Sequence, residues 1–225
     1  MLNASGAGSL MRGVRPLRVV HQSEPESRMN APNISAPAPQ PNFPIMPEAF
    51  WAKFSTTLQQ QWKPEVDGWW FGPNNRPQRT KFMTAVLTDL ARDFGCHCEC
   101  EYRKVDVSYF DRRAKGDWDK WSWEAAIELE NADSWKDEAS KLMEINAGLK
   151  VLIAYVDKQK KEHEKFLEQL LAIYRSRKYV TKPCNWLFIF GLFGELDWDF
   201  IAIKFDGMTT TEITGNVRIR TAGTH

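Results

Sequence analysis

The sequence lacks a charge excess, a long apolar run and a glycine-rich phosphate loop, and each absence excludes a class of protein. Its 30 Lys and Arg residues are nearly cancelled by 29 Asp and Glu residues, so the net charge is only +1. Such a chain has no global basic field for nucleic acid, and any contact with it must come from local patches. No stretch approaches the roughly 18 consecutive apolar residues that span a membrane, and no glycine-rich loop of a nucleotide-binding fold follows an expected strand.

Cysteine and histidine are also scarce, with four residues of each type. Cys96, Cys98 and Cys100 alternate within one short segment, where neighbouring positions on a strand cannot form unstrained disulfides. Zinc-binding cysteines usually have two or more residues between them, so we expect these three to pack as small apolar side chains. No Ser/His/Asp or Cys/His arrangement is visible in the sequence. The cysteine pattern favours a reducing cytoplasm as the compartment.

The chain has enough apolar material for one packed domain. Of its 225 residues, 43% are hydrophobic and 12% are aromatic. Residues 1–45 differ from the rest, because they are rich in Pro, Ser, Asn, Ala and Gly and have too little apolar surface to offset the entropy of ordering. We therefore expect a disordered tail over residues 1–45 and a single domain over residues 46–225.

Hydrophobic periodicity predicts a mixed α/β fold. The expected helices cover residues 47–62, 81–94, a span from a cap at residue 131 or 133 to residue 147, and 158–178; the expected strands cover residues 96–103, 104–110, 122–130, 149–156, 185–194 and 198–207. On the second strand, Val105, Val107 and Tyr109 are expected to share one face. Two helices, three strands and then helix, strand, helix, strand, strand indicate one mixed sheet with helices on both faces.

Three acidic residues on neighbouring strands are the candidates for chemistry. Glu128 and Glu130 are two positions apart, so both carboxylates leave the same face of their strand, and Asp106 lies on the preceding strand. If these strands form a hairpin, the three carboxylates converge, and oxygen ligands of this kind suit Mg²⁺ or Mn²⁺. The alternative is that each acid simply faces solvent. A central strand makes that alternative costly, because unpaired carboxylates there repel one another.

The segments "KVDVSYF", "WSWEAAIELEN", "SKLMEI" and "LKVLIAY" resemble the active-site block of the restriction-endonuclease-like superfamily, the PD-(D/E)xK nucleases. The resemblance covers about residues 80–156, where the order of elements agrees with the αβββαβ core of that superfamily. It implies that Asp106, Glu128 and the backbone carbonyl of Leu129 bind Mg²⁺ or Mn²⁺. Glu130 stands where the superfamily usually has its catalytic lysine, and we expect it to help bind metal or to orient the attacking water.

Lys141 is the best candidate for a lysine that has moved to another position. It lies at the edge of the apolar stripe of the following helix, where a long side chain can reach inward to stabilise charge on a phosphate. Lys104 and Lys136 are weaker candidates. The alternative for Lys141 is a plain solvent-facing lysine, because Asp137 and Glu138, one turn earlier, are polar.

The loop after the Asp106 strand carries Arg112, Arg113 and Lys115, which either hold phosphates beside the site or belong to a solvated hairpin loop. Three tryptophans nearby either stack on bases or pack on the sheet: Trp118, Trp121 and Trp123.

These patterns together predict a Mg²⁺-dependent endonuclease, a hydrolase acting on phosphodiester bonds in DNA and less readily in RNA, without a membrane partner. A homodimer is expected if both strands of a duplex are cut. The main alternative is a catalytically inactive module of the same fold that binds protein or nucleic acid, favoured by the missing lysine and by the net charge near zero. A third possibility is an assembly protein with a similar strand order by chance.

Overall fold

A computed structural model of the chain describes residues 44–63, 76–111, 122–131, 135–158, 162–176, 185–193 and 197–220. Within this part of the chain, the helices are α1 (Pro47–Gln61), α3 (Arg76–Asp93), α4 (Trp135–Glu144) and α5 (Glu162–Ser176). The strands are β1 (Cys96–Tyr102), β2 (Val105–Asp111), β3 (Trp123–Asn131), β4 (Ala147–Asp157), β5 (Asn185–Phe193), β6 (Asp197–Phe205) and β7 (Thr210–Arg220).

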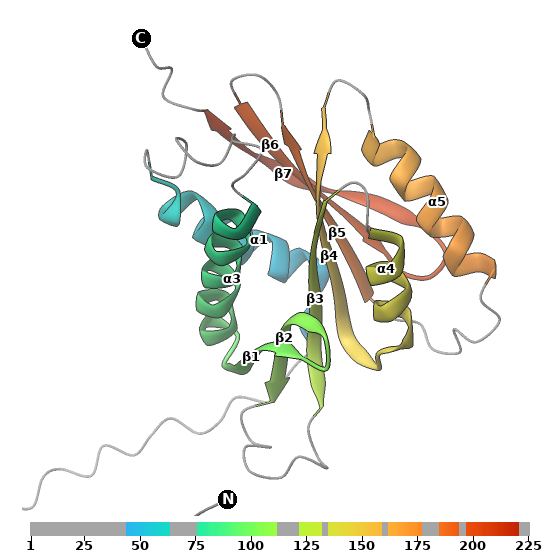
Figure 1. Cartoon of the computed structure of the whole chain (residues 1–225), viewed down its shortest axis with the longest axis horizontal. Helices are drawn as coiled ribbons and strands as arrows, with labels where there is room; N and C mark the ends of the chain where they lie inside the picture. Colours follow the sequence, from blue (N-terminus) through green and yellow to red (C-terminus); the bar gives the residue numbers. More distant parts are fainter. Residues whose placement is uncertain are drawn as a thin grey trace, which may run out of the picture. The chain divides into compact units, whose positions relative to one another are not determined.

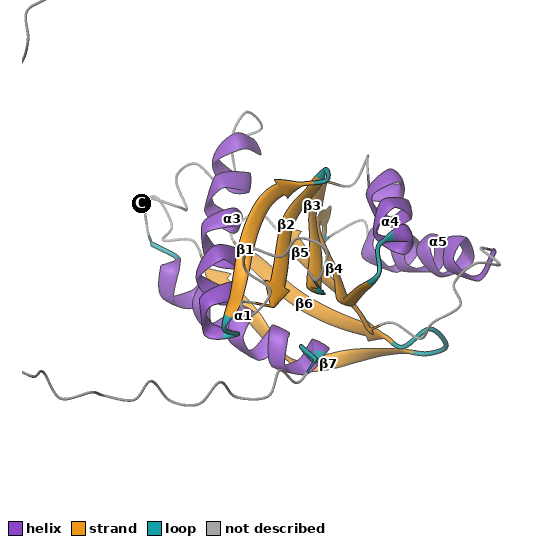
Figure 2. Ribbon diagram, turned by 90° about the horizontal axis from the view of Figure 1, so that it is seen from below, coloured by secondary structure: helices purple, strands orange, loops and turns teal. Residues whose placement is uncertain are grey.

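The strands form one seven-stranded mixed sheet in which the spatial order follows the chain order, β1 to β7. The pairs β1–β2, β2–β3, β5–β6 and β6–β7 are antiparallel, whereas β3–β4 and β4–β5 are parallel. Parallel neighbours need a crossover, and α4 and α5 are the helices that supply the two crossovers. Helices α1 and α3 cover one face of the sheet and α4 and α5 cover the other (Figures 1 and 2). The mixed α/β class predicted from periodicity is confirmed.

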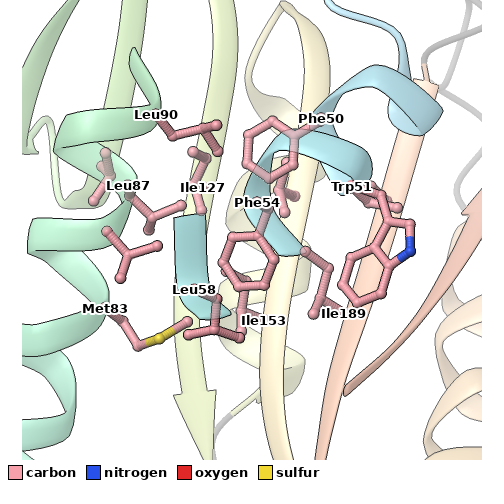
Figure 3. Packing of buried hydrophobic residues seen from close by; sticks show 14 of the residues in the cluster. Phe50, Trp51, Phe54, Leu58, Met83, Leu87, Leu90, Ile127, Ile153 and Ile189 are labelled. Atoms are coloured by element: carbon pink, nitrogen blue, oxygen red, sulfur yellow. The ribbon is translucent and has the colours of Figure 1, made fainter. Parts of the chain in front are cut away.

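The larger of the two cores lies between the sheet and the helices α1 and α3. Phe50 and Phe54 of α1 are fully buried, and their rings stack with centroids 6.2 Å apart. They contact Leu87 of α3 and the inward side chains of the central strands, such as Ile127 and Ile153 (Figure 3). Each fully buried side chain of this size stabilises the fold by about 1.5–3 kcal/mol. This core holds the sheet on which the candidate site is built.

The second core lies between the other face of the sheet and the helices α4 and α5. Leu142 of α4 and Phe166 of α5 are buried against Ala126 of β3 and Phe188 of β5. Trp135 at the start of α4 packs on Phe166, which joins the two helices. Because Leu142 is buried here, the preceding residue, Lys141, lies where α4 meets the sheet.

The main differences from the sequence-based expectation lie in α3, at the junction of α4 with β4, and in β7. Helix α3 begins at Arg76, ahead of the expected start, and α4 ends at Glu144, so that Ala147 opens β4 instead of closing the helix. The α4 helix ends early because Ala147 pairs with Trp123 in the parallel ladder. Strand β7 was not predicted, since most of its side chains are exposed and only Val217 and Ile219 are buried in the core.

The tail expected over residues 1–45 falls, as far as residue 43, outside the described residues. Ile45, just before α1, is already buried in the larger core. Among the described residues, no helix has the length and the apolar character needed to cross a membrane.

Candidate active site

The site begins where β2 separates from β3. The ladder between these strands runs from Phe110–Trp123 to Val107–Ile127 and includes no pair beyond Val107. At the next residue of β2, Asp106, a side chain makes the contact with β3 in place of the backbone. Its Oδ2 accepts a hydrogen bond from the backbone N–H of Leu129 at 2.8 Å. Asp106 is therefore held beside the residue that precedes Leu129, which is Glu128.

The backbone just before Asp106 is unusual. Arg103 and Lys104 have φ angles of 51° and 66°, in the left-handed region that few residues other than glycine adopt. The expectation that Val105 shares a face with Val107 and Tyr109 is wrong. Val105 is buried in the core next to α4, whereas the other two are in the core next to α1 and α3. The simple alternation fails because the strand leaves the ladder at this point.

Glu128 is the most deeply buried acid of the described residues, with 1% of its surface exposed. Its Oε1 atom lies 2.7 Å from Nζ of Lys141 on α4. Burial raises the pKa of Glu128 to about 8, the lysine opposes this shift, and the nearby carboxylates of Asp106 and Glu138 add to it. The Asp106 carboxylate is thus close enough to Glu128 for the two charges to interact.

Lys141 brings a cation to this pair of carboxylates from the helix layer. Its ammonium group pairs with Glu128 and with Glu138, and it donates a hydrogen bond to the backbone carbonyl of Lys104. Burial lowers the pKa of Lys141, but the two carboxylates outweigh burial and raise it overall. The Lys141 side chain is 27% exposed, so it extends from the buried Glu128 carboxylate to the protein surface. The structure thus places Asp106, Glu128 and Lys141 together.

Glu130 is not part of the same group. It is 8% exposed, and its Oε2 lies 3.9 Å from the guanidinium of Arg76, on the helix that covers the opposite face from α4. Within the described ranges, no three His, Cys, Asp or Glu side chains form a group that could hold a metal ion. The expected convergence of three strand carboxylates is therefore wrong, because Glu128 and Glu130 point to partners on different helices. Of the three, the carboxylates of Asp106 and Glu128 remain close to each other.

A pocket of about 430 Å³ adjoins Lys141, a size that suits a small ligand or one phosphate group with its sugar. It is lined by Arg103, Ser122, Trp123, Lys141, Glu144, Ile145 and Asn146. Trp123 packs edge-on against Phe110, with ring centroids 5.0 Å apart, so it belongs to the aromatic surface of the sheet. Arg103 and Lys141 supply positive charge to the lining of the pocket.

Among the other basic residues named from the sequence, Lys104 and Lys136 lie in the described part of the chain. Arg112, Arg113 and Lys115, like Trp118 and Trp121, lie outside the described residues. Lys136 is exposed on α4, with its ammonium 5.7 Å from the ring of Trp135. Lys104 contributes its backbone carbonyl, as described above.

Among the described residues, the three cysteines of β1 form no disulfide, and they differ in exposure. Cys96 is buried and Cys98 is half-buried against the larger core, while Cys100 is exposed. Burial raises the pKa of Cys98 to about 11. This matches the expectation of small packed side chains for the first two residues.

The sequence-based interpretation missed Glu138. It treated this residue as a sign that its face of α4 is solvated, whereas Glu138 pairs with Lys141 beside Glu128. The available signal was the spacing, because residues three apart on a helix are neighbours on its surface.

The carboxylates fit a hard divalent cation. Asp106 and Glu128 offer the oxygen ligands that Mg²⁺ and Mn²⁺ prefer, and Mg²⁺ is commonly held by only one or two carboxylates and several waters. Glu128 Oε1 is fully buried, and the cation that the structure places against it is the ammonium group of Lys141. A divalent cation would stabilise a buried carboxylate more strongly than one monovalent ammonium group does.

No family model matches the sequence, and no curated protein or solved structure shows detectable similarity to the chain.

Proposed function

We propose that this protein is a metal-dependent nuclease that hydrolyses phosphodiester bonds in DNA, and less readily in RNA, on a restriction-endonuclease-like core. The observation that carries the proposal is the assembly of Asp106, Glu128 and Lys141 from β2, β3 and α4 around one buried carboxylate. The chain order α3, β1, β2, β3, α4, β4 supports it, because it is the αβββαβ order of that superfamily.

Each residue of the group has a distinct role in the proposal. Asp106, Glu128 and the backbone carbonyl of Leu129 would hold Mg²⁺ or Mn²⁺, which supplies an activated water and neutralises charge on the phosphodiester. The hydrogen bond from Leu129 N–H fixes the Asp106 carboxylate, so one ligand is oriented before a cation arrives. Glu130 contacts Arg76 of α3 instead, so the proposal gives it no role at the metal.

Lys141 and the adjoining pocket would bind the substrate phosphate. An ammonium group on a four-carbon stem stabilises the negative charge that develops on a phosphate in the transition state. Arg103 lines the same pocket and offers a second cation for the flanking phosphate. Specific binding of this kind needs no excess of positive charge over the whole chain, which agrees with the net charge of +1.

The second candidate function is an inactive module of the same fold that binds protein or nucleic acid. The observation in its favour is the contact of Lys141 with Glu128 and Glu138, because paired charges neutralise one another and need no further partner. Cleavage distinguishes the two candidates.

The experiment is a cleavage assay on plasmid DNA, single-stranded DNA and RNA, each with Mg²⁺ and with Mn²⁺. Glu128→Gln keeps the shape of the side chain and removes its charge, and Glu212→Gln, at an exposed position on β7, is the matched control. We expect the first variant to lose at least about 100-fold in rate and the control to retain full activity. Wild-type protein that leaves all three substrates intact would support the inactive module instead.

The proposal includes a reducing compartment, the cytoplasm, in which Cys96, Cys98 and Cys100 would remain reduced. It also includes a homodimer, because two active sites are needed to cut both strands of a duplex in one encounter. Sedimentation of the protein with and without duplex DNA tests the dimer.

A further inference from the structure

The ammonium group of Lys141 lies among three oxygen atoms from three separate segments. Two are carboxylate oxygens, Glu128 Oε1 from β3 and Glu138 Oε2 from α4, and the third is the backbone carbonyl of Lys104 before β2. The left-handed φ of 66° at Lys104 belongs to the turn that brings this carbonyl to the ammonium group. The lysine therefore occupies a small cradle of oxygens and does not extend along the protein surface.

The two carboxylate oxygens of this cradle share one ammonium group. Both oxygens are buried, and both are in ion-pair contact with Lys141. Glu128 is 1% exposed, so water cannot complete its coordination. Two acidic side chains thus share one monovalent cation, and burial opposes the negative charge on Glu128.

A divalent cation would match this cradle better than the ammonium group does. Mg²⁺ and Mn²⁺ take oxygen ligands from carboxylates, backbone carbonyls and water, which are the groups present or accessible here. The lysine is able to leave, because its stem is flexible and its side chain already reaches the pocket lined by Arg103.

We propose that Lys141 holds the cation position while the protein is free of metal, and that an arriving cation releases Lys141 into the adjoining pocket. Since no three acidic side chains of the described residues are grouped around one ion position in the metal-free arrangement, Glu138 would join Glu128 as a ligand only when the lysine leaves. This inference rests on the proposed function and extends it. It assigns Glu138 a role and predicts an order of binding: the lysine becomes available to a substrate phosphate only after the metal has displaced it.

The first test is calorimetric titration of the full chain with Mn²⁺. Glu138→Gln should bind Mn²⁺ about 10- to 100-fold more weakly than the wild type, whereas Asp137→Asn, an exposed neighbour on the same helix, should bind it as the wild type does. Lys141→Met removes the competing charge and should bind Mn²⁺ about fivefold more tightly. Lys136→Met is the matched control and should show no change. Unchanged affinity in both Glu138→Gln and Lys141→Met would overturn the inference.

The second test needs no variant and measures the lysine itself. Wild-type protein is treated briefly with an amine-acylating reagent, with and without saturating Mn²⁺, and the modified lysines are quantified by mass spectrometry. Acylation of Lys141 should rise at least about fivefold when Mn²⁺ is present, because a lysine released from an ion pair is more accessible, while Lys136 should not change. Equal acylation of Lys141 in both states would overturn the exchange.

The two proposals fail in different ways. If the wild type binds Mn²⁺ but neither Glu138 nor Lys141 responds, the exchange is refuted, and the proposed nuclease still stands on Asp106 and Glu128. If both residues respond but no nucleic acid is cleaved, the exchange stands and the nuclease is refuted. If the wild type binds no Mn²⁺, the cation site itself is refuted.

Discussion

The contact between Lys141 and Glu128 gives the most quantitative prediction about this fold. Lys141→Met removes the ammonium group and keeps an apolar stem of similar length, which leaves the Glu128 carboxylate buried without its cation. Glu128→Gln removes the carboxylate charge instead. The double variant removes both charges, so no uncompensated charge remains.

The magnitude follows from the exposure of the two side chains. An exposed ion pair contributes up to about 1 kcal/mol, and removal of one partner from a fully buried pair costs about 3–5 kcal/mol. This pair lies between those limits, since Lys141 is 27% exposed and Glu128 is 1% exposed. We expect Lys141→Met to lower the free energy of unfolding by about 2 kcal/mol, or Tm by about 4–8 °C in a domain of this size.

The assay is a double-mutant cycle measured by urea unfolding at about pH 9, above the pKa of about 8 to which burial raises Glu128, so that its carboxylate is charged. The loss in Lys141→Met should be largely restored when Glu128→Gln is added, which gives a coupling energy of about 1.5 kcal/mol. The same cycle with Lys136→Met should be additive, because Lys136 is exposed on α4. A coupling below about 0.5 kcal/mol between Lys141 and Glu128 would refute the contact on which the site is built.

Three further predictions concern other parts of the molecule. Gly191→Ala on β5 should lower the free energy of unfolding by about 1–3 kcal/mol, because a Cβ there would lie 2.9 Å from the ring of Tyr155; urea unfolding of a variant as stable as the wild type would contradict this. Burial raises the pKa of Asp199, but Lys158 and Arg218 outweigh burial and lower it, so its charge stabilises the fold above the unfolded pKa. That contribution disappears as the pH falls through the folded pKa, and Asp199→Asn should therefore lose less stability than the wild type between neutral pH and acid; parallel losses would contradict it. At mildly alkaline pH, iodoacetamide should modify exposed Cys100 well before Cys98, whose pKa burial raises to about 11, and equal rates by mass spectrometry would contradict this.

Much of the fold was predictable because its central elements carry strong local patterns. The continuous apolar run of β4 indicates a strand covered on both faces, and its side chains are in fact divided between the two cores. Strand β7 has no such pattern. Its register with β6 shifts between Phe200 and Ala202, and Gly215 has a φ of 102°, so a regular alternation of apolar residues is not maintained along it.

The candidate site was predictable only in part. The sequence separates Asp106 and Glu128 by a loop, and a hairpin expectation was enough to bring them together. Glu130 was placed with them because strand periodicity puts it on the same face as Glu128, but periodicity carries no information about Arg76, which pairs with it from a distant helix. Glu138 depends on how α4 docks on the sheet, and helical spacing alone does not determine that docking.

The central claim is that Asp106 and Glu128 together bind a divalent cation. Its most direct test is a crystal of the protein soaked in Mn²⁺ and measured at the manganese absorption edge. The account predicts an anomalous peak within bonding distance of oxygens from both carboxylates, with the Lys141 ammonium moved away from Glu128. Diffraction that shows no peak between the two carboxylates, with Lys141 still paired to Glu128, would contradict it.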